Sequence, residues 1–249
     1  MIKLAVIADD LTGANDTALQ FAKRNIRSSV KIDLVNASSC DTEEVVVADS
    51  DSRDLDAAAA YAKVREICLH MQRLHPAHVF KKIDSTLRGN IGAEIRAAED
   101  VFAPELVIIA PAYPRIRRTT VGGHHLMDGM PLTEIANAPK TPVKDSYIPA
   151  ILARQAEGIP LAVLDYQIVH SGVEATAAEI ARLRAGGARW IISDIVEERN
   201  FVDLMEALRP CQQILWGLPI IFPRSTAGRG LRCARRHSVQ VRSSSARAV

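Results

Sequence analysis

Short apolar runs alternate with helix-like segments along nearly the whole of this chain. The runs at 2–8 and 106–112 are continuously apolar, as in strands that are buried on both faces of a sheet. Segments with helical periodicity separate such runs, and strands that alternate with helices pair in parallel through βαβ units. We therefore predict an α/β fold with three αβα layers around a mainly parallel, Rossmann-like sheet.

The same periodicities predict where each element lies. The predicted strands are 2–8, 29–35, 44–49, 78–84, 106–112, 160–165, 189–194 and 212–222. The predicted helices are 15–25, 55–75, 91–102, 146–157, 172–186 and 198–208. The segment 111–145 fits neither period and is rich in Pro, Gly, Arg and His, which is typical of a functional insertion.

Composition limits the class of protein. With 249 residues, of which 48% are hydrophobic, the chain can build one large domain or two small ones. No apolar run approaches the roughly 18 residues of a membrane helix, and acidic residues follow the first apolar run too soon for a signal peptide. The four cysteines form no CxxC pair, which indicates reduced thiols. We expect a cytoplasmic protein with no membrane partner.

The net charge of +2 conceals an uneven distribution. Residues 223–249 hold seven Arg and no Asp, Glu or Lys, which leaves 24 basic against 29 acidic side chains in residues 1–222. We predict a domain over 1–222 and an atypical basic tail over 223–249. A basic tail is one signature of nucleic-acid binding. This tail lacks periodicity and resembles a shifted reading frame or a truncated end, so nucleic acid is not the partner we expect.

Two adjacent carboxylates, Asp9 and Asp10, follow the first predicted strand in "VIADDLTGANDTA". We predict a turn at 12–14, with Asn15 or Asp16 capping the helix that follows. Ligands of parallel α/β sheets bind at the carboxyl ends of strands, where a carboxylate can accept a hydrogen bond from a hydroxyl or remove its proton. Helix capping explains one acid but not two. We predict a catalytic carboxylate here, with Asp10 favoured over Asp9.

A second polar group ends the strand in "FKKIDSTLRGNIGAE". Strand residues alternate between faces, so Lys82 and Asp84 point the same way. Lys82 and Arg88 would hold a carboxylate, whereas Asp84 and Ser85 would bind hydroxyl groups. This motif therefore predicts a site for a small polyhydroxylated anion.

Two further segments add candidate binding residues. Arg53, in "DSDSRDLD", is either a clamp for an anionic group or a solvated loop charge. Arg118, Gly123 and His124 lie in "RTTVGGHHLMDGMPL" and would close over a ligand. The pair His124–His125 has no third ligand at metal spacing, so we predict no metal site.

These motifs together resemble the four-carbon acid sugar kinases, which act on D-threonate, erythronate or 3-oxotetronate. The resemblance covers about residues 2–216 and rests on "ADDLTGAND", "KKIDSTLRGNIGAE" and "RTTVGGHHLMDGMPL…PKTPV…SYIP". It implies that this chain is the sugar-acid-binding domain of an ATP-dependent kinase. Two other families fit this sequence less well. The segment "DLTGAND" is similar to a motif of ribokinase-like sugar kinases, but that motif lies late in their chains. The D-x-D motif of dehalogenase-type phosphatases is absent.

The resemblance also sets expectations for cofactors and partners. It implies a small sugar acid as substrate, with ATP and Mg²⁺ bound mainly by a second domain that we expect to be absent from this chain. It leaves homo-oligomerisation open. The sequence departs from the family at "RIRRT", at Ala138 and throughout 223–249. The alternative function is a sugar-acid-binding protein without turnover, such as a remnant, a sensor or a type III effector-like protein.

Overall fold

A computed structural model describes residues 2–34, 42–135 and 143–219 of this chain. The predicted basic tail at 223–249, Ala138 and the end of the last predicted strand lie outside the described residues. The predictions made for them therefore stay predictions.

An eight-stranded sheet forms the centre of the described part of the chain, in the order β2-β3-β1-β4-β11-β5-β10-β9. Every neighbouring pair in this sheet is parallel, which confirms the predicted fold class. The bounds are β1 (Leu4–Ala8), β2 (Ser28–Lys31), β3 (Val45–Asp49), β4 (His78–Lys82), β5 (Leu106–Ile109), β9 (Leu161–Leu164), β10 (Trp190–Ser193) and β11 (Ile214–Leu218).

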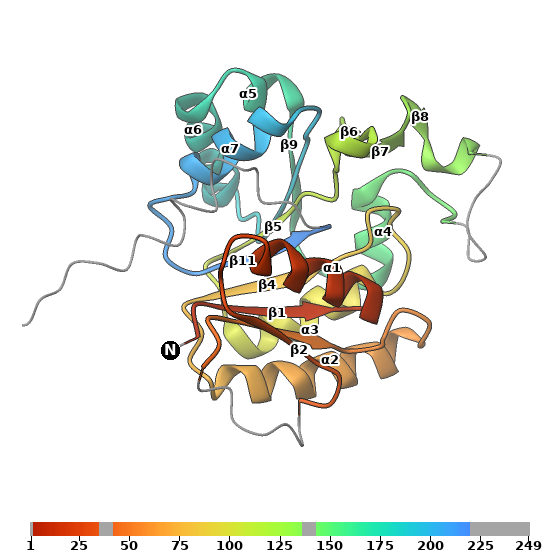
Figure 1. The fold of residues 1–249 in the computed structure, drawn as a ribbon. Coiled ribbons are helices and arrows are strands. Elements are labelled where there is room, and N and C mark those ends of the chain that lie inside the picture. Colours follow the sequence, from red (N-terminus) through yellow and green to blue (C-terminus); the bar gives the residue numbers. More distant parts are fainter. Residues whose placement is uncertain (1, 35–41, 136–142, 220–249) are drawn as a thin grey trace, which may run out of the picture.

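Helices cover both faces of this sheet (Figure 1). One face packs against α2 (Ala57–Gln72), α3 (Ile91–Phe102) and α4 (Ile148–Gln155). The other packs against α1 (Leu11–Ala22), α5 (Tyr166–His170), α6 (Val173–Ala185) and α7 (Glu198–Ala207). All five residues of β1 are buried and alternate between these two cores, which explains why this strand reads as a continuous apolar run.

Helix α1 begins earlier than the sequence pattern predicts. Asp10 has an extended backbone, and its Oδ1 accepts a hydrogen bond of 3.0 Å from the N–H of Gly13, so Asp10 is the N-cap. The predicted turn at 12–14 and the predicted caps Asn15 and Asp16 are therefore wrong. Several acids in this segment could cap a helix, and only the backbone conformation decides between them. The short helix α5 was not predicted.

The described part of the segment 111–145 contains a small antiparallel sheet, where the sequence pattern predicts neither helix nor strand. It contains β6 (Arg118–Val121), β7 (His124–Met127) and β8 (Met130–Pro131), with 3-10 turns at η1 (Pro114–Ile116) and η2 (Leu132–Glu134). Thr120 and Ile195 exchange backbone hydrogen bonds of 2.8 and 3.1 Å, which tie β6 to the chain leaving β10. The hairpin β6–β7 is thus fixed to the carboxyl edge of the large sheet.

Candidate functional site

The candidate site lies where the sheet changes its direction of winding. Strand β1 pairs with β3 on one side and with β4 on the other, so the loops that follow β1 and β4 diverge at the carboxyl edge. Ligands of open α/β sheets bind in the crevice at such a point. We call the following residues the site cluster: Asp9, Asp10, Arg53, Lys82, Asp84, Ser85, Arg88 and Arg118.

Arg53 joins the two aspartates that follow β1. Its Nε donates to Asp9 Oδ2 at 2.7 Å, and its Nη1 donates to Asp10 Oδ2 at 2.6 Å. Burial lowers the pKa of Arg53, but the hydrogen bond and the charge of Asp9 raise it more, so its pKa lies above the ordinary value. Arg53 is therefore a half-buried, charged partner of this acidic pair and not a solvated loop charge.

Lys82 lies beside the same carboxylates and is almost fully buried. Burial lowers its pKa, although the charges of Asp9, Asp10 and Asp84 oppose this shift. Its Nζ donates to the carbonyl of Ile83 at 3.0 Å, which uses one of its three N–H groups. The ammonium group is thus held in place and keeps two N–H groups for further hydrogen bonds.

Gly13, in the first turn of α1, leaves room for these groups. A Cβ atom at this position would lie 2.7 Å from both Lys82 Nζ and Asp10 Oδ1. The residue is helical, so no tight turn requires a glycine here. The glycine is instead required by the close approach of the helix backbone to Lys82 and Asp10.

Asp84 and Arg88 form a second ion pair in the loop after β4. Arg88 Nε donates to Asp84 Oδ2 at 2.7 Å and Arg88 Nη2 to Oδ1 at 3.2 Å, and the hydroxyl of Thr86 also donates to Oδ2. Burial raises the pKa of Asp84, but the bonds from Arg88 and Thr86 outweigh burial and hold this pKa well below its usual value. Both carboxylate oxygens are engaged within the loop.

Arg118 brings the hairpin into the site cluster, because its Nη1 donates to the hydroxyl of Ser85. Burial lowers the pKa of Arg118. Among the described residues, Arg118 Nε is buried without a hydrogen-bond partner, and the same is true of Asp9 Oδ1. An unpaired buried donor and an unpaired buried acceptor are costly in the free protein. Each of these two atoms has the capacity for one further hydrogen bond.

Gly123 and His124 lie elsewhere in the hairpin. The N–H groups of Gly122 and Gly123 donate to Asp194 at 2.6 and 2.9 Å, and the ring of His124 lies 4.8 Å from that of Tyr147. No contact found among the described residues joins either one to the site cluster. Their predicted binding role stays a prediction, whereas their observed contacts fix the hairpin.

Sequence reasoning missed a buried ion pair beneath the site. Lys81 Nζ lies 2.8 Å from Glu94 Oε2, both side chains are almost completely buried, and Ser52 Oγ donates to Glu94 Oε1 at 2.7 Å. Strand alternation indicates that Lys81 points away from Lys82, but it gives no partner for Lys81. This pair links β4, α3 and the loop that carries Arg53.

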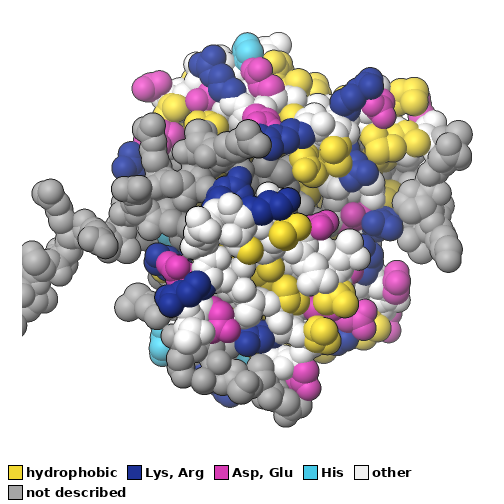
Figure 2. Space-filling model, in the orientation of Figure 1, with side chains coloured by type: hydrophobic (Ala, Val, Ile, Leu, Met, Phe, Trp, Pro, Cys, Tyr) yellow, Lys and Arg dark blue, Asp and Glu magenta, His cyan; other side chains and the backbone are white. Residues whose placement is uncertain are grey.

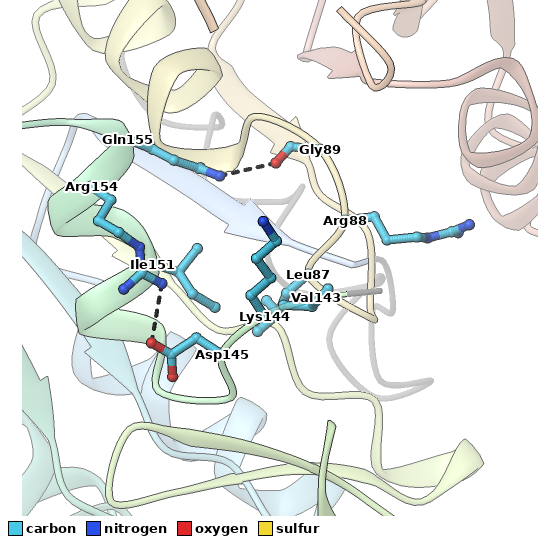
Figure 3. Close-up of a pocket in the computed structure, with 9 residues that line it drawn as sticks. All are labelled: Leu87, Arg88, Gly89, Val143, Lys144, Asp145, Ile151, Arg154 and Gln155. Atoms are coloured by element: carbon cyan, nitrogen blue, oxygen red, sulfur yellow. Dashed lines mark hydrogen bonds and ion pairs between the residues drawn. The ribbon is translucent and has the colours of Figure 1, made fainter. Parts of the chain in front are cut away.

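A cavity of about 240 Å³ lies behind the loop that follows β4 (Figure 3). Leu87, Val143 and Ile151 form its apolar part, and Lys144 points into it. Arg88 turns its guanidinium away from this cavity, toward Asp84. The cavity therefore borders the site cluster through Arg88 in the 84–90 loop.

The described residues offer no group of three or more His, Cys, Asp or Glu side chains that could hold a metal ion, and no helix among them is long and apolar enough to cross a membrane. Cys68 and Cys211 are free thiols, while Cys40 and Cys233 lie outside the described residues. Acidic and basic side chains are interspersed over the face drawn in Figure 2, which shows no large basic area.

Known proteins resemble this chain over most of its length. Residues 4–218 match the family model described as a sugar-binding N-terminal domain. D-threonate kinase of Salmonella typhimurium is 40% identical over 219 residues, which cover 85% of this chain and 49% of that kinase. D-erythronate kinase of Heliobacterium modesticaldum is 34% identical over 209 residues, which cover 80% of this chain and 46% of that kinase.

A crystal structure gives the same picture. A domain of unknown function from Bordetella bronchiseptica, solved with bound citrate as a domain-swapped dimer, superimposes with a TM-score of 0.71 at 29% identity. The superposition covers 86% of this chain and 53% of that one. The chain thus spans about half the length of the curated relatives it matches.

Proposed function

The chain belongs to the family of sugar-binding N-terminal domains, and on that premise we propose that its site cluster binds a four-carbon sugar acid of the threonate or erythronate class. It would present one hydroxyl group of this acid to the ATP-dependent phosphoryl transfer for which the relatives are named. Citrate, bound in the Bordetella bronchiseptica structure, is likewise a small hydroxy acid. The observation that carries the proposal is the set of unused donors and acceptors in the site cluster.

The positive groups suit the carboxylate of such an acid. Lys82 keeps two of its three N–H donors, and Arg118 has a buried Nε–H without a partner among the described residues. A carboxylate accepts hydrogen bonds from ammonium and guanidinium groups at roughly twice the strength of a neutral pair. We assign the carboxylate to Lys82 and Arg118, with Arg53 bridging the two aspartates.

The structure favours Asp9 over Asp10 as the carboxylate that meets the substrate hydroxyl. Asp10 Oδ1 caps α1 and its Oδ2 is bound to Arg53, so both oxygens have partners. Asp9 uses only Oδ2, and its Oδ1 is buried and unpaired. A free carboxylate oxygen within hydrogen-bond reach of a hydroxyl can orient that group and remove its proton. We therefore propose Asp9 for the role that the sequence assigned to Asp10.

At the starts of α1 and α3, part of the set of backbone N–H groups that a phosphate of ATP would need is already engaged. A phosphate cradle needs free backbone N–H groups at a helix start. At the start of α1 the carboxylate of Asp10 takes the N–H of Gly13, and at the start of α3 the N–H of Gly92 donates to Gln155 Oε1 at 2.7 Å. We derive no step through ATP or Mg²⁺ from these residues and propose for them the binding of the acid only.

Calorimetric titration of the purified chain tests this proposal. D-threonate should bind, and threitol, which lacks the carboxylate, should bind at least about ten-fold more weakly because it cannot pair with Lys82 and Arg118. Asp9→Asn should bind D-threonate about ten-fold more weakly than the unmodified chain does. Asp10→Asn preserves the cap and should change the affinity by about three-fold or less. Equal affinity for D-threonate and threitol would refute the proposal, and the opposite order of the two variants would refute the assignment of Asp9.

A further inference from the structure

His125 lies at the junction between the hairpin and the site cluster. The residue is completely buried, on strand β7 opposite Thr120 of β6. Its Nε2 lies 2.9 Å from the carbonyl oxygen of Ser85, and its Nδ1 lies 3.3 Å from the hydroxyl of Thr120. One imidazole ring therefore joins two strands of the hairpin to the loop that carries the site residues.

The partners of His125 determine which nitrogen carries the proton. A carbonyl oxygen can only accept, so Nε2 must be the protonated nitrogen. In a neutral imidazole the other nitrogen is an acceptor, and the hydroxyl of Thr120 can donate to it. Both nitrogens are thereby satisfied in the neutral ring, so this arrangement selects one tautomer.

The hairpin itself is held to the large sheet by several hydrogen bonds, so its residue His125 can fix the position of the loop that it contacts. Asp194, at the end of β10, accepts hydrogen bonds from the N–H groups of Gly122, Gly123 and Tyr166 at 2.6, 2.9 and 3.2 Å. Thr120 and Ile195 exchange two further backbone bonds. The hairpin is therefore held to the large sheet at Thr120, Gly122 and Gly123, just before His125 in sequence.

Ser85 is the residue of the 84–90 loop that needs such a fixed position. The chain leaves the sheet just before it, where Ile83 N–H donates to Leu218 O at 3.0 Å. The hydroxyl of Ser85 accepts from Arg118, and its carbonyl accepts from His125. Arg118 and His125, both in the hairpin, thus hold the hydroxyl and the carbonyl oxygen of Ser85. Asp84 directly precedes Ser85 in the chain.

We infer that His125 is a positioning residue for sugar-acid binding: its neutral imidazole, protonated on Nε2, holds the Ser85 carbonyl so that the 84–90 loop and Arg118 face the ligand together. This inference rests on the proposed function for its ligand. His170 of α5 provides a control histidine, because its exposed ring packs against Tyr166 and it is not among the candidate binding residues. Neither the family resemblance nor the sequence motifs single out His125.

Three variants of the purified chain test the inference by titration with D-threonate. His125→Phe keeps a ring but removes the donor, and we expect affinity to fall by about ten-fold or more. His125→Gln places an amide N–H near the position of Nε2 and should restore affinity to within about three-fold of the unmodified chain. His170→Gln should bind as the unmodified chain does. A His125→Phe variant with unchanged affinity, or a His125→Gln variant as weak as His125→Phe, would overturn the inference.

Two measurements without a ligand separate this inference from the proposed function. Long-range ¹H–¹⁵N spectra at pH 7 should show His125 neutral with its proton on Nε2, and an Nδ1-protonated ring would overturn the inference. Hydrogen exchange across residues 84–90 should be faster in His125→Phe than in His170→Gln, and equal exchange in the two variants would overturn the inference too. If the unmodified chain fails to bind D-threonate, the proposed function fails while these two measurements still decide the placement of the loop by His125.

Discussion

Substitution of Gly13 by alanine should weaken ligand binding but leave the stability of the fold nearly unchanged. The added Cβ would lie 2.7 Å from Lys82 Nζ, 2.9 Å from Lys82 Cε and 2.7 Å from Asp10 Oδ1, all closer than real Cβ contacts allow. The lysine end must therefore move. Each hydrogen bond to a charged group contributes about 1.5–3 kcal/mol, so losing the ammonium contact to a carboxylate should weaken D-threonate binding by roughly 10- to 150-fold.

The same substitution should leave the fold nearly as stable as before. Alanine in a helix is favoured over glycine by about 0.5–1 kcal/mol, which offsets part of the cost of displacing Lys82. We expect the free energy of unfolding, measured with urea, to change by no more than about 1 kcal/mol. The control is Gly186→Ala, because Gly186 at the end of α6 has φ −76° and a Cβ there would lie 3.3 Å from its nearest neighbour. Undiminished D-threonate affinity in Gly13→Ala would refute the steric reasoning, and so would a loss of several kcal/mol in stability.

Two further predictions concern buried charges. Glu94→Gln leaves the Lys81 ammonium buried without its counter-charge and should lower the free energy of unfolding by about 3–5 kcal/mol. Adding Lys81→Met should recover most of this loss. Urea titrations in which Glu94→Gln costs less than about 1 kcal/mol would contradict this prediction. Burial lowers the pKa of His125 to about 4, so the unfolded chain, in which histidine titrates near 6.5, binds this proton first as the pH falls. The free energy of unfolding should therefore decrease by up to about 3 kcal/mol as the pH falls from about 6.5 to 4. His125→Gln should lack this part of the decrease. Identical pH profiles of stability for the variant and the unmodified chain would count against a neutral buried ring.

The fold could be predicted because its strands are buried on both faces. Strand β3 has all five residues buried, and its sequence "VVVAD" is accordingly apolar up to Asp49 at its carboxyl end. The start of α1 could not be predicted in the same way. Asp10, Asn15 and Asp16 are all residue types that cap helices, and the extended backbone of Asp10 that decides between them is not visible in the sequence.

The location of the site could be predicted from strand ends, but its pairings could not. Polar residues after β1, β3 and β4 meet because parallel strands end at one edge. Which acid pairs with which base depends on contacts distant in sequence, such as Arg53 with Asp9 or Lys81 with Glu94. Strand alternation places His124 and His125 on opposite faces, yet only the contact with Ser85 shows which ring faces the site.

The charges of the site cluster bear on which ligand it can accept. Arg53, Lys82, Arg88 and Arg118 supply four formal positive charges, and Asp9, Asp10 and Asp84 supply three negative ones. Arg53 is paired with Asp9 and Asp10, and Arg88 with Asp84. This leaves one positive charge in excess, shared between Lys82 and Arg118, in a region where burial makes uncompensated charge costly. A ligand with one carboxylate neutralises this excess, whereas a neutral polyol leaves it uncompensated and a phosphate dianion reverses it. Charge balance therefore favours an unphosphorylated monocarboxylic sugar acid as the ligand of this site over its phosphorylated form.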